Sequence, residues 1–210
     1  MTVGRIIETQ ACVAEGAQYL AARCERMAAA LEAVGEVPLR RRDDGFGALL
    51  SAIVSQQVSV ASAAAIWGRL EAAGLVDVAS VRAARDEDLR GCGLSRPKVR
   101  YARALAQAEV HYGALRVASD AQVVAELTQV AGIGRWTAEV YAMLSLGRAD
   151  VFAAGDLALQ EAARMLYGLE VRPSEAELRR MAQDWAPWRA VAARLLWAYF
   201  RVAKQREGIS

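Results

Sequence analysis

The chain of 210 residues carries a formal net charge of +2, and hydrophobic residues make up 55% of it. This length can bury a hydrophobic core, as one domain or as two small lobes. The hydrophobic residues are spread over short amphipathic segments, so none approaches the roughly 20 apolar residues of a membrane span. The small net charge gives only weak support for a polyanionic partner, because such binding depends on local clustering of charge.

The N-terminus lacks the basic and then apolar pattern of a signal peptide, so a cytoplasmic protein is expected. The three cysteines, Cys12, Cys24 and Cys92, are odd in number and show no metal-ligand spacing. They are expected to be buried thiols of a reduced cytosol. Three cysteines are also too few for a four-cysteine iron–sulfur cluster.

Apolar residues recur at helical spacing along most of the chain, and no strand pattern extends beyond three or four residues. The sequence therefore predicts an all-α protein. Gly35 and Gly168 are expected to end helices, and Ser59 and Ser174 to begin them. In chain order, the predicted helical segments are residues 7–34, 46–54, 60–70, short turns over 75–90, then 98–111, 119–127, 136–144, 157–167, a helix that begins at 174, and 189–204.

Gly132 and Gly134 separate two of these helices and predict a tight hairpin, because glycine adopts positive φ at little cost. A helix-hairpin-helix directs the first N–H groups of its second helix outward, where the helix dipole adds partial positive charge. A phosphate is the natural ligand of such a helix start. An ordinary helix–turn–helix connection is the alternative, and the hairpin alone does not decide between the two.

Three further polar segments have structural explanations when taken alone. Asp156 directly precedes a predicted helix, so its carboxylate is a natural N-cap. The segment Ser55-Gln56-Gln57 is a polar turn between two apolar helices. The charged run over residues 40–44 is expected to be a solvated loop that leads into the next helix.

Three motifs in order give these residues a common context. They are Ala-Gly-Ile-Gly-Arg-Trp-Thr-Ala at 131–138, Asp-Val-Phe-Ala-Ala-Gly-Asp at 150–156, and Asp-Trp-Ala-Pro-Trp-Arg at 184–189, followed by Leu-Trp-Ala-Tyr at 196–199. Together they resemble the DNA-3-methyladenine glycosylase II family, whose members are helix-hairpin-helix glycosylases with a catalytic aspartate. The resemblance extends from about Asp44 to Phe200.

The resemblance implies a DNA glycosylase fold of two helical lobes, in a short form without the family's N-terminal β domain. Residues 1–210 are expected to form one glycosylase unit. The approximate lobes are residues 44–155, which contain the hairpin at 127–146, and residues 1–43 together with 156–210.

The resemblance also implies the chemistry. Asp156 occupies the position of the catalytic aspartate, which stabilises the oxocarbenium character of the sugar and activates water while the N-glycosidic bond of an alkylated purine is hydrolysed. Bifunctional members of the superfamily carry a nucleophilic lysine where this chain has Trp136. A monofunctional enzyme without lyase activity is therefore expected, and its catalysis requires no cofactor.

Further roles follow from the same positions. Trp136 and Trp197 are expected to hold the cationic base by stacking and cation–π contacts, with Gln56 and Tyr141 bordering that pocket. Val140 departs from the family, whose members can have tyrosine there, and leaves the shape of the pocket open. Gln57 is expected to fill the gap left by the extruded nucleotide, where family members can have leucine.

DNA-backbone contacts are expected from four residues at the hairpin, and a structural Na⁺ or K⁺ is expected on three carbonyls beside them. The DNA-binding residues are Gly132, Gly134, Arg135 and Thr137. The carbonyls are those of Thr128, Val130 and Ile133.

The expected partner is double-stranded DNA that contains alkylated bases, bound by a monomer near the nucleoid and not at a membrane. The preferred lesion stays open among methylated, etheno and deaminated purines. A non-catalytic binder of DNA structure is the main alternative. A helical protein-interaction module is a third possibility, which an absence of salt-dependent DNA binding would favour.

Overall fold

The computed structural model describes residues 3–206, and within this range the chain is all-α, as predicted. The only β pairing among these residues is an isolated antiparallel bridge between Ile6 and Arg148. Over the same residues, no helix has both the length and the apolar character needed to cross a bilayer.

The chain divides into two compact units, one formed mainly by Arg42–Tyr141 and the other by Gly4–Arg41 with the residues from Ala142 onward. The sequence placed the second division at 155/156, whereas the structure places it at 141/142. Main-chain hydrogen bonds explain the difference. Ala149 N–H donates to the Arg5 carbonyl at 3.0 Å and Ile7 N–H donates to the Gly147 carbonyl at 2.7 Å, so the segment before Asp156 belongs with the N-terminal residues.

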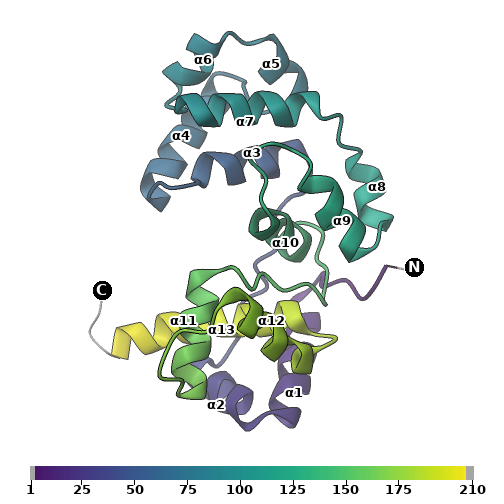
Figure 1. Ribbon diagram of the computed structural model, residues 1–210, viewed down its shortest axis with the longest axis vertical. Helices are drawn as coiled ribbons and strands as arrows, with labels where there is room; N and C mark the ends of the chain where they lie inside the picture. The colour runs from purple at the N-terminus through teal and green to yellow at the C-terminus, as the bar shows by residue number, and fades with distance from the viewer. Residues whose placement is uncertain (1–2, 207–210) are drawn as a thin grey trace. The chain divides into compact units, whose positions relative to one another are not determined.

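The first unit contains seven helices and most of an eighth, labelled in Figure 1. α7 packs against α3, α5 and α6 and forms the centre of this unit. Its helices are α3 (Phe46–Ser55), α4 (Val60–Ala72), α5 (Val78–Ala83), α6 (Asp86–Gly91), α7 (Arg96–Gln107), α8 (Tyr112–Val117), α9 (Asp120–Leu127) and α10 (Arg135–Leu144), of which α10 ends in the second unit.

The helix predicted over 98–111 is interrupted in the structure. α7 ends at Gln107, and Glu109 has a φ of 49°, which an α-helix does not accommodate. A separate short helix, α8, begins at Tyr112. Apolar spacing continues through the break, which is why the sequence pattern did not reveal it.

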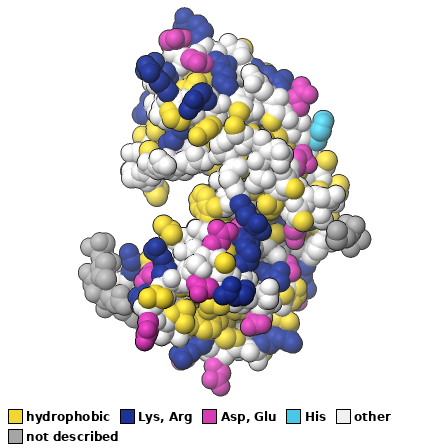
Figure 2. All heavy atoms as spheres, viewed as in Figure 1, with side chains coloured by type: hydrophobic (Ala, Val, Ile, Leu, Met, Phe, Trp, Pro, Cys, Tyr) yellow, Lys and Arg dark blue, Asp and Glu magenta, His cyan; other side chains and the backbone are white. Residues whose placement is uncertain are grey.

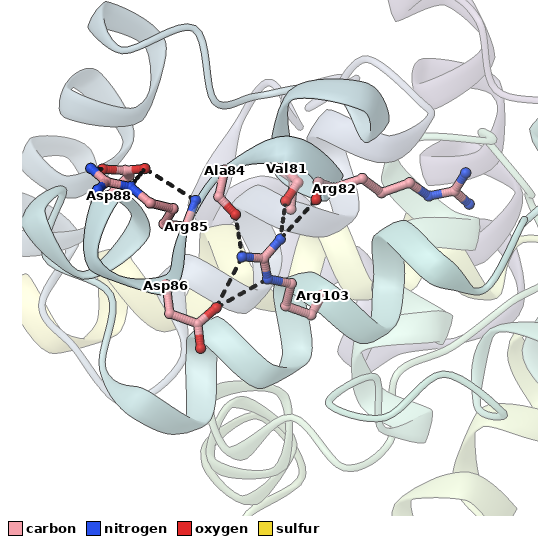
Figure 3. A network of polar contacts seen from close by, with 7 residues as sticks. All are labelled: Val81, Arg82, Ala84, Arg85, Asp86, Asp88 and Arg103. Carbon is pink, nitrogen blue, oxygen red and sulfur yellow. Dashed lines mark hydrogen bonds and ion pairs between the residues drawn. The ribbon is translucent and has the colours of Figure 1, made fainter.

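Arg103 of α7 holds the α5–α6 corner together (Figure 3). Its guanidinium donates to the carbonyls of Val81 and Ala84 and to Asp86, with Nε and Nη2 at 3.2 and 2.9 Å from Asp86 Oδ1. On the face shown in Figure 2, Lys and Arg side chains gather over α5–α7 with Asp and Glu side chains among them. This end of the unit therefore carries charges of both signs.

In the second unit α13 packs against α1, α2 and α11. Gly16 of α1 permits this packing, because a Cβ there would lie 2.7 Å from the Trp188 ring. As predicted, Gly35 and Gly168 follow helices with φ of 73° and 65°, and Ser174 forms a capping box with Glu177. The helices of this unit are α1 (Gln10–Arg23), α2 (Glu25–Val34), α11 (Leu157–Tyr167), α12 (Glu175–Met181) and α13 (Arg189–Arg206), with a 3₁₀ turn at Ala182–Trp185.

Arg194 of α13 is fully buried and donates to three main-chain carbonyls. Its guanidinium lies 2.8 Å from the Leu39 and Ala190 oxygens and 3.0 Å from the Met143 oxygen. Burial, followed by the nearby charges of Arg41 and Arg40, lowers its pKa to about 10. The side chain thereby fixes the segment after α2 and the end of α10 to α13.

The cysteines differ from expectation in one respect. Cys92 is buried, but Cys12 and Cys24 are only half-buried, and all three are free thiols. Cys24 lies at the junction of α1 and α2, with its sulfur 3.5 Å from the Tyr167 hydroxyl.

Candidate active site and DNA-binding hairpin

The predicted hairpin joins α9 to α10 and is anchored by two buried apolar side chains, Val130 and Ile133. Ile133 N–H donates to the Val130 carbonyl at 3.0 Å, which closes the turn. Gly132 has a φ of 92°, and a Cβ there would lie 2.3 Å from Cγ of the Tyr101 ring. Glycine is therefore required at this position both by the backbone angle and by the close packing of α7.

Gly134 has a different environment. Its φ is outside the positive range, it is exposed, and a Cβ built on it would have no heavy atom within 4 Å. The expectation that both glycines supply positive φ is thus wrong for Gly134. Because the space beside Gly134 is open, its lack of a side chain lets another molecule approach the start of α10 closely.

The first main-chain bond of α10 runs from Ala138 N–H to the Gly134 carbonyl at 3.0 Å, so the helix provides no internal acceptor for the amides that precede it. The Arg135 side chain is exposed and its Nε lies 2.9 Å from Oε1 of the buried Glu139. Thr137 is only 5% exposed, so its expected DNA contact is limited to its main-chain amide.

The aromatic residues of α10 have opposite environments. Trp136 in the first turn is 43% exposed, whereas Tyr141 is 4% exposed and its hydroxyl accepts a 2.9 Å hydrogen bond from Gly45 N–H. Burial raises the pKa of Tyr141. The structure therefore places Tyr141 in the core of the first unit, while Val140 is half-buried; the role of Tyr141 in a base pocket stays a prediction.

The two glutamines of the turn between α3 and α4 have different environments. Gln57 is exposed and has a φ of 56°, an unusual conformation for a residue with a side chain. Gln56 is half-buried, and its Nε2 donates to the Gly132 carbonyl at 2.9 Å. Gln56 therefore contacts the hairpin, and its place at the edge of the base pocket stays a prediction.

Asp156 caps the start of α11 in the second unit. Its Oδ1 accepts from the amides of Ala158 and Leu159 at 2.9 and 3.0 Å. The same oxygen accepts from the indole N–H of Trp197 at 3.2 Å. The structure thus brings together two of the residues predicted from the sequence, the candidate catalytic carboxylate and one of the pocket tryptophans.

Arg40 adds a cation to this group. It is half-buried, and its guanidinium carbon lies 5.5 Å from the centroid of the Trp197 ring, in cation–π geometry. The solvated loop predicted over residues 40–44 is therefore wrong for Arg40. The only sequence signal was the run of three arginines, and it does not specify an aromatic partner.

Comparison with known proteins decides the family. The model of the HhH-GPD superfamily base excision DNA repair proteins matches residues 50–187, most of the chain and both the hairpin and Asp156. The chain belongs to the HhH-GPD superfamily.

Two relatives are similar to this chain over most of their length. DNA-3-methyladenine glycosylase 1 of Schizosaccharomyces pombe is 29% identical over 172 residues, 77% of this chain and 75% of that protein. The solved structure of the S. pombe 3-methyladenine DNA glycosylase in complex with abasic DNA has a TM-score of 0.78 and covers 87% of this chain and 95% of that one. The DNA-3-methyladenine glycosidase of Bacillus halodurans is 34% identical, with a TM-score of 0.79 and 88% coverage of both chains.

These findings confirm the resemblance to the 3-methyladenine glycosylases that the three motifs indicated. The family match does not assign roles to individual residues, so these are inferred from their geometry and chemistry. The hairpin and the N-cap position of Asp156 are present as predicted, whereas the difference between the two glycines and the bond from Trp197 to Asp156 were not predicted. The hydrogen bond of Gln56 to the hairpin and the stacking of Arg40 were not foreseen.

Proposed function

We propose that this protein is a monofunctional DNA glycosylase that removes alkylated purines from duplex DNA, acting as a monomer in base excision repair. The observation that carries the proposal is the fixed carboxylate of Asp156. Three N–H donors converge on its Oδ1 and hold the group in one orientation at the start of α11.

In the proposed reaction, the bond between C1′ and the purine nitrogen breaks, and its electron pair leaves with the base. An alkylated purine that already carries positive charge becomes neutral in this step, so it is a good leaving group. The sugar develops oxocarbenium character, which a fixed negative charge stabilises. Water then adds to C1′ with its proton accepted by Asp156 or solvent, and the products are the free base and an abasic site.

Selection of the base is proposed to depend on its charge. The guanidinium carbon of Arg40 lies 5.5 Å from the centroid of the Trp197 ring, and this cation–π geometry supports the proposal. A cationic purine gains stacking and cation–π stabilisation on such a ring that a neutral base lacks. Trp136, exposed at the start of α10, is proposed to offer the base a further aromatic face.

The absence of lyase activity is proposed from the position of the lysines. Trp136 stands where bifunctional members have their nucleophile, and Lys98 is buried in the first unit with its Nζ 2.7 Å from the Val54 carbonyl. Burial lowers the pKa of Lys98. Its amine is engaged by the end of α3, so water is proposed as the nucleophile.

The hairpin is proposed to bind the DNA backbone. Gly134 leaves room for a phosphate at the start of α10, and the exposed Arg135 supplies positive charge beside it. The carbonyls of Thr128, Val130 and Ile133 are hard oxygen donors that suit Na⁺ or K⁺, although Val130 also accepts from Ile133 N–H. When bound, such a cation would offset the charge of the phosphate, and catalysis would require no other cofactor.

The direct test is to incubate the protein with methylated duplex DNA and to separate the released bases by chromatography. Release of free 3-methyladenine or 7-methylguanine, without strand cleavage and without a covalent adduct on borohydride treatment, is the expected result. Binding without base release would instead support a non-catalytic binder of DNA structure. A borohydride-trapped adduct would contradict the monofunctional mechanism.

A further inference from the structure

The exposed turn between α3 and α4 contains a residue in a strained backbone conformation. Gln57 adopts a left-handed backbone conformation with its side chain in solvent. Such a conformation costs free energy for any residue other than glycine and persists only where the surrounding structure holds it. Two contacts from elsewhere in the first unit help to hold this turn.

One such contact lies at the last turn of α3. Lys98, on α7, is 8% exposed and its Nζ donates to the Val54 carbonyl at 2.7 Å. A cation at a helix C-terminus also interacts favourably with the helix dipole. α7 thereby sets the position at which α3 ends and the turn begins.

The second contact reaches the DNA-binding hairpin. Gln56 Nε2 donates to the Gly132 carbonyl at 2.9 Å, across 76 positions in the sequence. Gly132 in turn packs so closely on the Tyr101 ring that no side chain fits there. Tyr101 and Lys98 lie three residues apart on α7, on neighbouring turns of one helix face.

We infer that Gln56 is a positioning residue that couples the turn carrying Gln57 to the hairpin. Through this hydrogen bond, the position of the hairpin on the DNA backbone determines how far the Gln57 side chain inserts into the duplex. α7 supports both partners through Lys98 and Tyr101. This inference rests on the proposed function, because it assigns Gln56 a role in extruding the base and none in the chemistry of the bond.

The chemistry of the contact specifies the variants. Gln56→Ala removes the donor, and Gln56→Glu keeps the length but places a carboxylate against the Gly132 carbonyl. Each variant is expected to slow single-turnover base release from an intact duplex about 5- to 10-fold, the loss of one hydrogen bond. Affinity for a duplex with an abasic analogue, which needs no extrusion, is expected to stay close to that of the wild type. Gln107→Ala, at an exposed site on α7, is the matched control.

A double-mutant cycle separates positioning from a general structural role. If Gln56 acts through Gln57, the variant with both residues changed to alanine releases base no more slowly than Gln57→Ala alone. Additive losses, or equal losses of abasic-DNA affinity and of rate in Gln56→Ala, would overturn the inference.

Thermal unfolding of Gln56→Ala and Gln56→Glu verifies that both variants fold. Should the wild type release no base, the proposed function fails, and the same cycle measured with 2-aminopurine fluorescence of the bound duplex decides the inference. Non-additive loss of the fluorescence increase supports coupling, and additive loss contradicts it.

Discussion

The two hairpin glycines should respond oppositely to the same substitution. In Gly132→Ala the new methyl group would meet Cγ of Tyr101 at 2.3 Å and Cβ at 2.6 Å, on a backbone with a φ of 92°. Forcing alanine to positive φ costs roughly 1–2 kcal/mol. Overpacking against the ring adds about 1–3 kcal/mol. Together these give a destabilisation of about 2–5 kcal/mol, a fall in Tm on the order of 10 °C for a chain of this length.

Gly134→Ala should behave differently, because a Cβ there has no heavy atom within 4 Å and the backbone angle suits any residue. Its stability should change by less than about 1 kcal/mol and can increase, since alanine restricts the unfolded chain more than glycine does. The methyl group would, however, stand where a phosphate approaches the start of α10. Loss of one charge-assisted hydrogen bond there predicts roughly 10-fold or more weaker DNA binding.

The assay pairs thermal unfolding followed by circular dichroism with fluorescence anisotropy on a labelled duplex that contains an abasic analogue. We expect Gly132→Ala to be less stable than the wild type, and Gly134→Ala to be as stable as the wild type but to bind DNA more weakly. Equal stability losses at both positions, or unchanged DNA affinity of Gly134→Ala, would refute the distinction between the two glycines.

The remaining predictions concern stability, pH and orientation of the carboxylate. Arg194→Met removes a side-chain donor from three main-chain carbonyls, two of them in buried bonds, and should lower the free energy of unfolding by about 3 kcal/mol or more. Arg201→Met at an exposed site on the same helix should not, and denaturant unfolding checks both. Trp197→Phe keeps the ring but removes the 3.2 Å bond to Asp156, and should lower kcat about 10-fold with little change in KM; an unchanged kcat would contradict an orienting role. Stability should fall as pH rises above about 10, because the unfolded chain then ionises tyrosines whose folded pKa values are raised by burial. Arg194 and Lys98, whose pKa values are lowered by burial, oppose this fall. Tm measured from pH 9 to 11 tests the prediction, and a flat profile would contradict it. These tyrosines are Tyr112, Tyr141 and Tyr167.

The features predictable from the sequence are those encoded locally. The hairpin followed from glycines between two apolar periodicities, and the N-cap position of Asp156 followed from the helix after it. The capping box of Ser119 and Gln122 at the start of α9 is likewise encoded locally, because its spacing is visible in the sequence.

Contacts between distant segments could not be read in this way. The hydrogen bond from Gly45 to Tyr141 joins residues 96 positions apart. From the sequence of α10 alone, Tyr141 is only the neighbour of Val140, where family members can have a tyrosine. The cation of Arg40 on Trp197 likewise depends on how the segment after α2 meets α13. Such pairs are set by tertiary packing, which periodicity does not specify.

The central claim is that Asp156 supplies the negative charge that stabilises the sugar cation while the glycosidic bond breaks. Asp156→Asn retains an oxygen that can accept from Ala158, Leu159 and Trp197, so the fold and DNA binding should persist. The decisive measurement is the single-turnover rate of 7-methylguanine release by this variant beside the wild type, together with the affinity of both for an abasic-analogue duplex. The account predicts a rate at least about 100-fold lower with affinity nearly unchanged. Release at close to the wild-type rate would contradict it.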